Sequence, residues 1–304
     1  MPTLRQLRAL SLIAQTGSFT KAAERLFVTQ SAVSALIRDL EEEAGTSLIV
    51  RGRALRLTEA GEHLQRAGAR AQQELDRALL EVQSGGQWAE RVLRVGAGSL
   101  SAATLLPPAI ARLRAQQGRL RVVLVDRPVG MVGDLLLSGE VDAALGSLES
   151  PLRLSTELRS ELLLTDSLCV VASASSQLAQ RAPRRKHTRW ADLGEAELVL
   201  VGRVGGQWNS LLRDQLAAHP GLRIGHEVQL LSTALELVRH DLGVAVLPRF
   251  ACRTLDLRAF WVSDLQAGGA KWSTYWLTRK AGTENSAAAL LLDALRNTLG
   301  RDGS

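Results

Sequence analysis

The sequence predicts an α/β protein in which an all-helical N-terminal domain and one long helix precede two α/β lobes. Three observations lead to this prediction: short apolar helical faces near the start, an unbroken amphipathic stretch after them, and apolar segments that alternate between strand and helix patterns over the rest. The 304 residues suffice for two or three domains with hydrophobic cores of their own.

The composition is that of an ordinary globular protein. Hydrophobic residues make up 46% and charged residues 22%, with 26 Gly and 8 Pro, which excludes collagen-like, low-complexity and disordered chains. The net charge of +6 permits a polyanionic partner without demonstrating one. The two cysteines cannot form a disulfide framework, and the first residues lack the apolar core of a signal peptide. We therefore expect a cytoplasmic protein.

Residues 1–58 have the pattern of a winged helix-turn-helix domain. Three short apolar faces follow one another at helical spacing. They consist of Leu4, Leu7, Leu10 and Ala14, then Ala22, Ala23 and Leu26, then Val33, Leu36, Ile37 and Leu40. Gly17 separates the first two helices, and Ser18 is suited to cap the second. An arginine-rich, β-like stretch at 48–58 completes the pattern as the wing.

Residues 59–88 predict one long linker helix. The stretch contains no proline, and small or apolar residues recur every three or four positions along it. This stripe consists of Ala60, Leu64, Ala67, Ala71, Leu75, Ala78 and Val82. A helix of this length with one narrow apolar stripe is expected to bury the stripe against a second copy, which makes a homodimer. Gly85 and Gly86 then end the helix.

Residues 89–304 alternate between strands and helices, which predicts two α/β lobes. The first lobe, about 89–163 with 266–304, is predicted from strand 92–95, helix 103–115, strand 120–126, helix 129–137, strand 141–145, and the returning strand 272–278 and helix 286–299. The second, about 164–265, is predicted from strands 168–172, 197–201, 224–229 and 244–247 and helices 207–217 and 232–240. The basic stretch Arg181 to Arg189 is interpreted as a surface loop.

Specific residues laid over these patterns resemble the LysR-type bacterial transcriptional regulators. In the N-terminal part they are Gly17 to Leu26, Thr29 to Ser34, Ile37, Leu40, Glu41, Leu48, Arg51, Arg53, Arg56 to Thr58, Ala60 and Gly61. In the remainder they are Leu105 to Pro107, Gly139 to Asp142 and Gly243 to Pro248. Ile49 and Ala44 depart from the pattern, where Phe and Leu are usual. The resemblance spans nearly the whole chain and implies a regulator with a two-lobed, periplasmic-binding-protein-like effector domain.

The same resemblance implies a DNA-binding surface on the third helix and the wing. A recognition helix offers its first turn to base edges in the major groove. The residues expected to read bases are Thr29, Gln30, Ser31, Ser34 and Arg38, and those expected at the DNA backbone or minor groove are Arg51 and Arg53, with Arg56 less directly placed. An ordinary solvated helix face is the alternative for the polar residues. The implied assembly is a dimer of dimers, a homotetramer, on double-stranded promoter DNA.

A small-molecule effector is expected between the two lobes, because ligands of α/β proteins bind beyond the carboxyl ends of strands. The expected contacts are Ser99, Leu100, Ser101, Pro128 and Ser147 from the first lobe and Arg203, Val204, Ser232 and Thr233 from the second. In the LysR type the effector is often a carboxylate, which Arg203 is suited to pair; an ordinary solvated surface arginine is the alternative for this residue. Plain helix capping is the alternative role of the serines and threonines.

Two other classes of protein remain as alternatives. The segment Gly96 to Ser101 after a strand is a partial dinucleotide fingerprint, which would suit an NAD(P)-binding enzyme. Its third glycine is missing and no other catalytic motif is present, so no enzymatic activity is expected. A small-molecule-binding protein of the periplasm would suit the two lobes, but it would need no helix-turn-helix.

The cysteines and histidines indicate no cofactor. Cys169 falls in an apolar strand and Cys252 lies far from it in sequence, so both are interpreted as buried, inert thiols and not as a redox pair. The five histidines show no paired spacing of metal ligands, so no metal site is expected.

Overall fold

The computed structural model describes residues 1–50, 52, 55–83, 91–116, 120–147, 155–181, 187–202, 212, 215–253, 255–256, 258–266, 271–280 and 285–301. The chain forms two compact units, Met1–Ala89 with Leu137–Glu140 and Glu90–Leu136 with Val141–Ser304. No helix in the described ranges is both long and apolar enough to cross a membrane.

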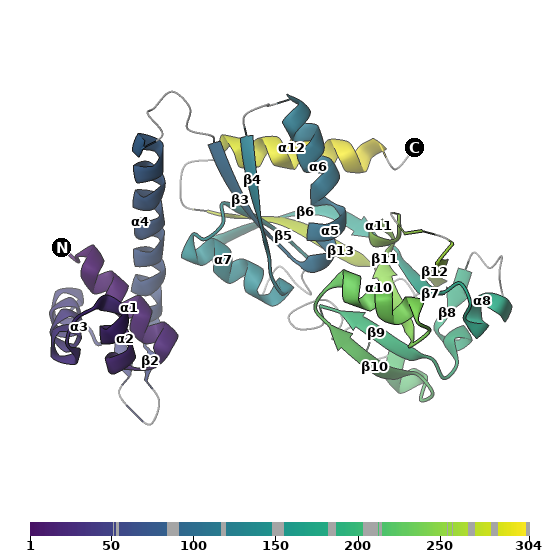
Figure 1. The fold of residues 1–304 in the computed structure, drawn as a ribbon, viewed down its shortest axis with the longest axis horizontal. Helices are drawn as coiled ribbons and strands as arrows, with labels where there is room; N and C mark the ends of the chain where they lie inside the picture. The colour runs from purple at the N-terminus through teal and green to yellow at the C-terminus, as the bar shows by residue number, and fades with distance from the viewer. Residues whose placement is uncertain are drawn as a thin grey trace. The chain divides into compact units, whose positions relative to one another are not determined.

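The first unit is a winged helix-turn-helix domain with a long helix, as the sequence predicts (Figure 1). Its elements are α1 (Leu4–Thr16), α2 (Phe19–Leu26), α3 (Gln30–Ala44), β1 (Ile49–Val50), β2 (Arg56–Leu57) and α4 (Glu59–Gln83). The strands β1 and β2 pair antiparallel, with Ile49 opposite Leu57, and form the base of the wing.

Each of the three short helices begins at a hydroxyl side chain that caps it. Thr3 forms a capping box with Gln6, Ser18 accepts a hydrogen bond from the Lys21 N–H, and Thr29 accepts one from the Ala32 N–H. These caps satisfy backbone donors that a helix start leaves without partners, so local residues determine where α1, α2 and α3 begin.

The core of this domain differs from the sequence prediction in α1. The buried residues of the domain are Gln6, Ala9, Leu10, Ile13, Ala22, Ala23, Val33, Ile37, Leu40, Leu48 and Ile49. Leu4 and Ala14 were expected inside but are exposed, because α1 turns the face of Ala9 and Ile13 toward the core. Leu7 packs instead on α4, where a Cβ built on Gly68 would lie 2.8 Å from the Leu7 Cβ.

The helix α4 begins at Glu59, as predicted, and is described as far as Gln83; Gly85 and Gly86 lie outside the described residues. Its first turn lies against the wing: a Cβ built on Gly61 would lie 2.1 Å from the backbone oxygen of Leu48. Farther along, Leu75 is 44% exposed, Leu79 57% and Val82 76%. The second half of α4 therefore presents an unpartnered apolar stripe, hereafter the Leu75–Leu79–Val82 stripe.

The second unit contains two mixed sheets, which are the two predicted lobes (Figure 1). In the described residues, one sheet has the order β4-β3-β5-β13-β6, formed by Leu120–Asp126, Arg91–Ala97, Ala143–Gly146, Trp272–Arg279 and Leu158–Asp166. The other has the order β10-β9-β11-β7-β12-β8, formed by Arg223–Val228, Glu197–Val201, Val244–Pro248, Leu168–Ser173, Phe260–Gln266 and His187–Arg189. The chain passes from the first sheet to the second at Ser167, and β13 returns to the first.

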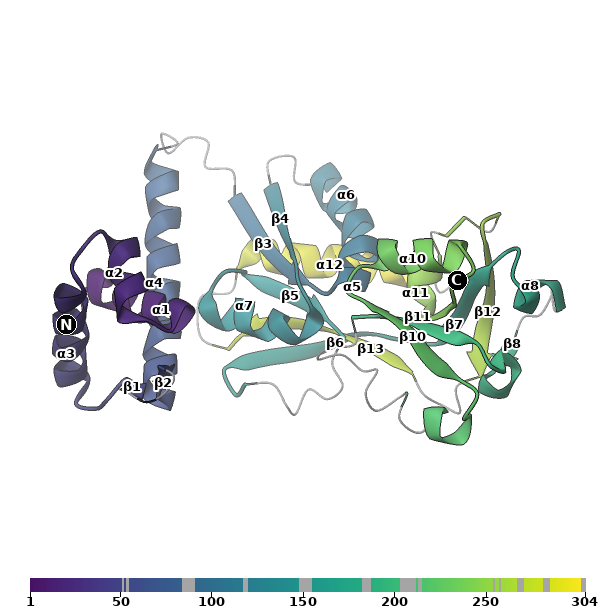
Figure 2. The same ribbon diagram turned by 60° about the horizontal axis from the view of Figure 1, so that its bottom comes forward.

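Helices cover both sheets. They are α5 (Ser99–Thr104), α6 (Leu106–Gln116), the 3-10 turn η1 (Val129–Met131), α7 (Val132–Ser138), α8 (Gln177–Arg181), the 3-10 turn η3 (Trp190–Leu193), α10 (Leu231–Arg239), α11 (Arg249–Cys252) and α12 (Ser286–Arg301). Both views show α6 and α12 side by side against the five-stranded sheet (Figures 1 and 2). The C-terminal helix α12 thus packs on the first lobe, most of whose elements lie far earlier in the sequence.

Several elements differ from the sequence prediction. Helix 103–115 is two helices, because α6 has Pro107 and Pro108 in its first turn, where a missing N–H is tolerated but continuation from α5 is not. The loop predicted between Arg181 and Arg189 contains β8, which pairs with β12 and buries Thr188 through a 2.8 Å hydrogen bond to Ser263. The strands β6 and β12 were not predicted. Helix 207–217 lies mostly outside the described residues; Leu212 and 215–218 are helical.

The contact between Gly61 and Leu48 makes a specific prediction about stability. We expect Gly61→Ala to destabilise the first unit by at least about 2 kcal/mol, because the added methyl would collide with backbone that cannot rotate away. The measurement is chemical denaturation of the full chain followed by circular dichroism. Gly133→Ala in α7 is the matched control: its Cβ would lie 3.6 Å from Leu158, so helix propensity should stabilise that variant by about 0.5–1 kcal/mol. Equal effects of the two substitutions would contradict the contact.

Candidate functional site

The start of α3 presents a polar group that consists of two hydrogen-bonded pairs of neutral side chains. The hydroxyls of Thr29 and Ser31 lie 2.9 Å apart, and the Gln30 amide donates a 3.4 Å hydrogen bond to the Ser34 hydroxyl. Thr29, Gln30 and Ser31 are exposed and Ser34 is half-buried. The structure therefore brings together four of the residues predicted to read bases, and Arg38 lies exposed farther along α3. Amide and hydroxyl groups in this arrangement can both donate to and accept from base edges.

The wing is held at its base from two sides. The Glu41 carboxylate, on α3, accepts hydrogen bonds from the backbone N–H groups of Leu48 at 2.8 Å and Ile49 at 3.2 Å. The Thr58 N–H donates to the Leu48 carbonyl at 3.0 Å, and its hydroxyl donates to the Ser47 carbonyl at 2.8 Å. These bonds fix the wing base relative to the helix that carries the polar group.

Of the three predicted wing arginines, Arg56 lies among the described residues. Arg56 is exposed in β2, opposite Val50. Arg51 and Arg53 lie outside the described residues. Their expected phosphate contacts stay predictions from the sequence.

The second unit contains a pocket between its two sheets, at the carboxyl ends of strands from both. Its space, including the part open to solvent, is ≈ 380 Å³. The residues that line it are Gly98, Ser99, Leu100, Ser101, Pro128, Val129, Ser147, Val201, Gly202, Gln229 and Trp272. The first sheet supplies the residues after β3, β4 and β5 and the second those at the ends of β9 and β10, so the pocket lies where the sequence predicted a ligand site.

All five effector contacts predicted from the first lobe line this pocket: Ser99, Leu100, Ser101, Pro128 and Ser147. Those predicted from the second lobe do not line its described part. Arg203 and Val204 lie outside the described residues, while Ser232 and Thr233 are exposed in the first turn of α10. The expectation that these two cap the helix was wrong, because α10 begins at Leu231 and its N-cap is Leu230.

Sequence reasoning missed Trp272, which begins β13 and closes one side of the pocket. Its indole N–H donates to the Ser147 hydroxyl at 2.5 Å, and that hydroxyl lies 3.1 Å from the Thr274 hydroxyl. No local signal marks Trp272, because only the pairing of β13 with β5 brings it beside Ser147. Gln229 was identifiable, since it directly follows β10.

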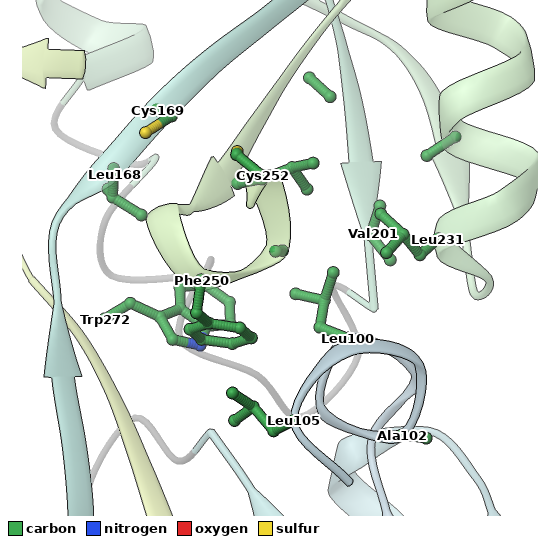
Figure 3. Close-up of a cluster of buried hydrophobic side chains, with 14 of the residues drawn as sticks. Leu100, Ala102, Leu105, Leu168, Cys169, Val201, Leu231, Phe250, Cys252 and Trp272 are labelled. Carbon is green, nitrogen blue, oxygen red and sulfur yellow. The ribbon is translucent and has the colours of Figure 1, made fainter. Parts of the chain in front are cut away.

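Buried apolar side chains of both lobes pack together beside the pocket. Figure 3 shows the Trp272 indole beside the Phe250 ring of α11, with Leu100 and Leu105 of the first lobe close to them. These residues belong to one continuous hydrophobic cluster that includes strands of both sheets. This packing makes one wall of the pocket apolar and tightly packed.

Charged groups are few around the pocket. None of the lining residues that the structure describes carries a formal charge. Burial raises the pKa of Asp126 at the end of β4, and the neighbouring Arg127 guanidinium partly opposes that rise. Among the described residues, no three His, Cys, Asp or Glu side chains gather in a way that could hold a metal ion.

The two cysteines lie together in the second lobe, which their sequence separation did not indicate. Both are buried and neither forms a disulfide (Figure 3). Interaction with the neighbouring Cys252 thiol, followed by burial, raises the pKa of the Cys169 thiol well above its usual range. Cys169 therefore stays protonated at neutral pH, where a thiol is a poor nucleophile. That the pair is inert stays a prediction.

The hydrogen bonds of Ser147 predict a role in stability that Ser99 does not share. Ser147→Ala would leave the buried Trp272 N–H without its acceptor, so we expect a loss of about 1–3 kcal/mol. Ser99 lines the same pocket, is half-buried and makes no side-chain hydrogen bond with described residues, so Ser99→Ala should change stability by less than about 0.5 kcal/mol. Thermal unfolding of both variants checks this, and equal melting temperatures would refute the role of Ser147.

Comparisons with known proteins match both units to the same family of proteins. Residues 4–62 match the family described as bacterial regulatory helix-turn-helix protein, lysR family, and residues 87–300 match the LysR substrate binding domain. The HTH-type transcriptional regulator CatR of Pseudomonas putida is 30% identical over 289 residues, covering 92% of this chain and 93% of its own. The uncharacterized HTH-type transcriptional regulator YfeR of Shigella flexneri is 30% identical over 254 residues, covering 82% and 79%.

Solved structures share the fold over nearly the whole chain. A full-length cysteine variant of OxyR from Pseudomonas aeruginosa has a TM-score of 0.66 at 24% identity, covering 97% of this chain and 94% of its own. CbnR, solved as a LysR family transcriptional regulator, has a TM-score of 0.64 at 19% identity, covering 97% and 99%.

Proposed function

Because the chain belongs to the LysR family of DNA-binding transcriptional regulators, we propose that α3 and the wing read promoter DNA and that a small molecule in the pocket controls the outcome. The hydrogen-bonded polar group at the start of α3 carries this proposal. The family is one of regulators, not enzymes, so the dinucleotide-like segment at Gly96 has another use: it forms the turn from β3 into the pocket.

The DNA contacts divide into two kinds. Gln30 can pair bidentately with adenine, and the small side chains at Ser31 and Ser34 allow α3 to approach base edges closely. Thr29 and Arg38 complete that surface. The wing arginines, Arg51 and Arg53, would contact phosphates and carry affinity that depends on salt more than on sequence.

The effector would lie between the sheets, against Ser99, Ser101 and Ser147. Hydroxyl donors suit a small molecule with a carboxylate or carbonyl group, and Arg203 is our candidate partner for a negative charge. Leu100, Pro128 and Val204 would supply apolar contacts, and Ser232 and Thr233 would take part only if α10 moves toward the ligand. Binding would change the arrangement of subunits on DNA. The protein would act in the cytoplasm, where promoters are.

A second copy would cover the Leu75–Leu79–Val82 stripe. These side chains recur at helical spacing and are exposed in the single chain, which is the pattern of a helix that pairs with another. The homodimer formed in this way would associate further into a homotetramer that grips two or more sites near a promoter.

A footprint tests the proposal most directly. Purified full-length chain would be applied, at two salt concentrations, to the intergenic DNA upstream of its own gene. Protection of a long, interrupted, partly palindromic region that weakens at the higher salt is the expected result. If that DNA is unprotected, the chain would next be used to select duplexes from a random pool. If this selection yields no preferred sequence, the proposal is overturned.

The polar group on α3 should govern base preference. We expect Gln30→Ala or Ser34→Ala to change discrimination at defined operator positions by about 1–3 kcal/mol, because each removes hydrogen bonds to base edges. Binding of the variants to a panel of single-base operator changes measures this. Equal weakening on every duplex would contradict base readout.

Arg51→Ala is the contrasting variant. It should weaken binding on all duplexes alike and flatten the slope of log affinity against log salt by about 1. An unchanged slope would count against a phosphate contact at this position.

The apolar stripe of α4 should hold the dimer together. Leu79→Asp removes two buried leucines per dimer, each worth about 1.5–3 kcal/mol, so we expect the dimer to weaken by at least about 100-fold. Light scattering over a concentration series measures it. His63→Asp, at an exposed position earlier in α4, is the control that should leave dimerisation unchanged. A Leu79→Asp variant that dimerises normally would place the interface elsewhere.

A further inference from the structure

The helix α2 ends on a residue that its backbone conformation does not favour. Phe27 caps the helix in the left-handed region, at φ 55° and ψ 44°, and its N–H donates to the Ala23 and Glu24 carbonyls. The helices on either side end in the same conformation on glycine, Gly17 at φ 61° and Gly45 at φ 66°. Bulky residues rarely adopt this conformation, and glycine or asparagine is the usual choice.

Packing does not account for the choice of phenylalanine. The ring of Phe27 is 95% exposed, whereas Leu26 and Val28 on either side are half-buried against the core of the domain. Neither the backbone nor the core therefore gains from an aromatic side chain here. A strained residue with no structural benefit is a pointer to function.

Phe27 lies beside the polar group at the start of α3. It precedes Thr29 by two residues, so their Cα atoms are at most about 7.6 Å apart. Phe27 belongs to the turn that delivers the recognition helix to DNA, which makes this inference dependent on the proposed function. A fully exposed ring at this point is within reach of the base pairs next to those that Thr29 and Gln30 would contact.

The chemistry of the surroundings favours DNA over a protein partner. The exposed residues that flank Phe27 in the chain are polar: Glu24, Arg25, Thr29 and Gln30. A protein-docking surface would need several apolar residues together. In the major groove, by contrast, one apolar side chain has a defined target, the C5 methyl group of thymine.

We propose that Phe27 is a specificity-determining residue that contacts the methyl group of a thymine adjacent to the bases read by the start of α3. It adds apolar readout to the hydrogen bonds of Gln30 and Ser34. The left-handed backbone then directs the ring out of the turn toward the base edge.

Removing either partner of the contact tests the proposal. The probe is a duplex selected from a random pool by the wild-type full-length chain, together with versions in which each thymine in turn is replaced by uracil, which lacks only the methyl. Replacing one particular thymine with uracil should weaken binding of the wild-type chain about fourfold, which corresponds to the loss of one buried methyl group. Phe27→Asn should bind the parent duplex about tenfold more weakly and show no loss at that same thymine. Phe27→Tyr keeps the ring and should behave as wild type.

Stability measurements separate recognition from folding. Phe27→Asn should unfold at the same or a higher temperature, because asparagine tolerates the left-handed region and no burial is lost. Asp241 is the other non-glycine residue with positive φ in the described chain, at 56°, and lies in the second unit. Asp241→Gly is thus the matched control: it should raise the unfolding temperature and leave DNA affinity unchanged.

The outcomes distinguish this inference from the proposed function. If Phe27→Asn binds within about twofold of wild type, or weakens on all duplexes while keeping the response to uracil, the inference is wrong. If Gln30→Ala still alters base preference in that case, the proposed function stands. Failure of the wild-type chain to select any duplex would overturn both.

Discussion

One continuous hydrophobic core joins the two sheets of the second unit, and the pocket depends on it. Trp272 from the last strand and Phe250 from α11 pack against Leu100 of α5 and Leu105 directly after it, so the sheets meet as one packed body at this point. Beside the contact, backbone turns at the ends of the strands leave a space that side chains do not fill. A ligand there touches both lobes at once. Since packed interiors have low compressibility, this shared core holds the two sheets together beside the pocket.

In the first unit, hydrogen bonds join neighbouring elements, as the hydrophobic core joins the two sheets in the second unit. The Glu41 carboxylate belongs to α3 but accepts hydrogen bonds from the backbone at the start of the wing, so the two elements that we propose to contact DNA are joined to each other. Close approach of Gly61 to Leu48 adds a steric constraint from α4. The helix that carries the Leu75–Leu79–Val82 stripe is therefore packed directly against the base of the wing. In the proposed function, a change in how two copies of α4 pair would act on the wing through this contact.

The parts of the structure that could be predicted are those with local causes. The apolar spacing of Val33, Ile37 and Leu40 indicated α3, and β4 and β9 have the predicted bounds, because apolar runs bounded by turns determine them. The half-buried edge strand β6 escaped prediction since its burial does not alternate regularly. In the pocket, the residues that follow β3, β4 and β5 were predicted from sequence order, whereas Gln229, which follows β10, was not. Trp272 was not, because its position depends on pairing between β13 and a strand more than a hundred residues earlier.

The return of β13 to the first sheet has a consequence for synthesis of the chain. The helix-turn-helix is contiguous and can fold as soon as it leaves the ribosome, whereas the five-stranded sheet lacks one of its inner strands until almost the whole chain has been made. Between those moments, a growing polypeptide has a completed DNA-binding end and an incomplete sensing end. The same holds for any chain cut short before β13, which would retain the means to reach DNA while losing the means to respond to a signal.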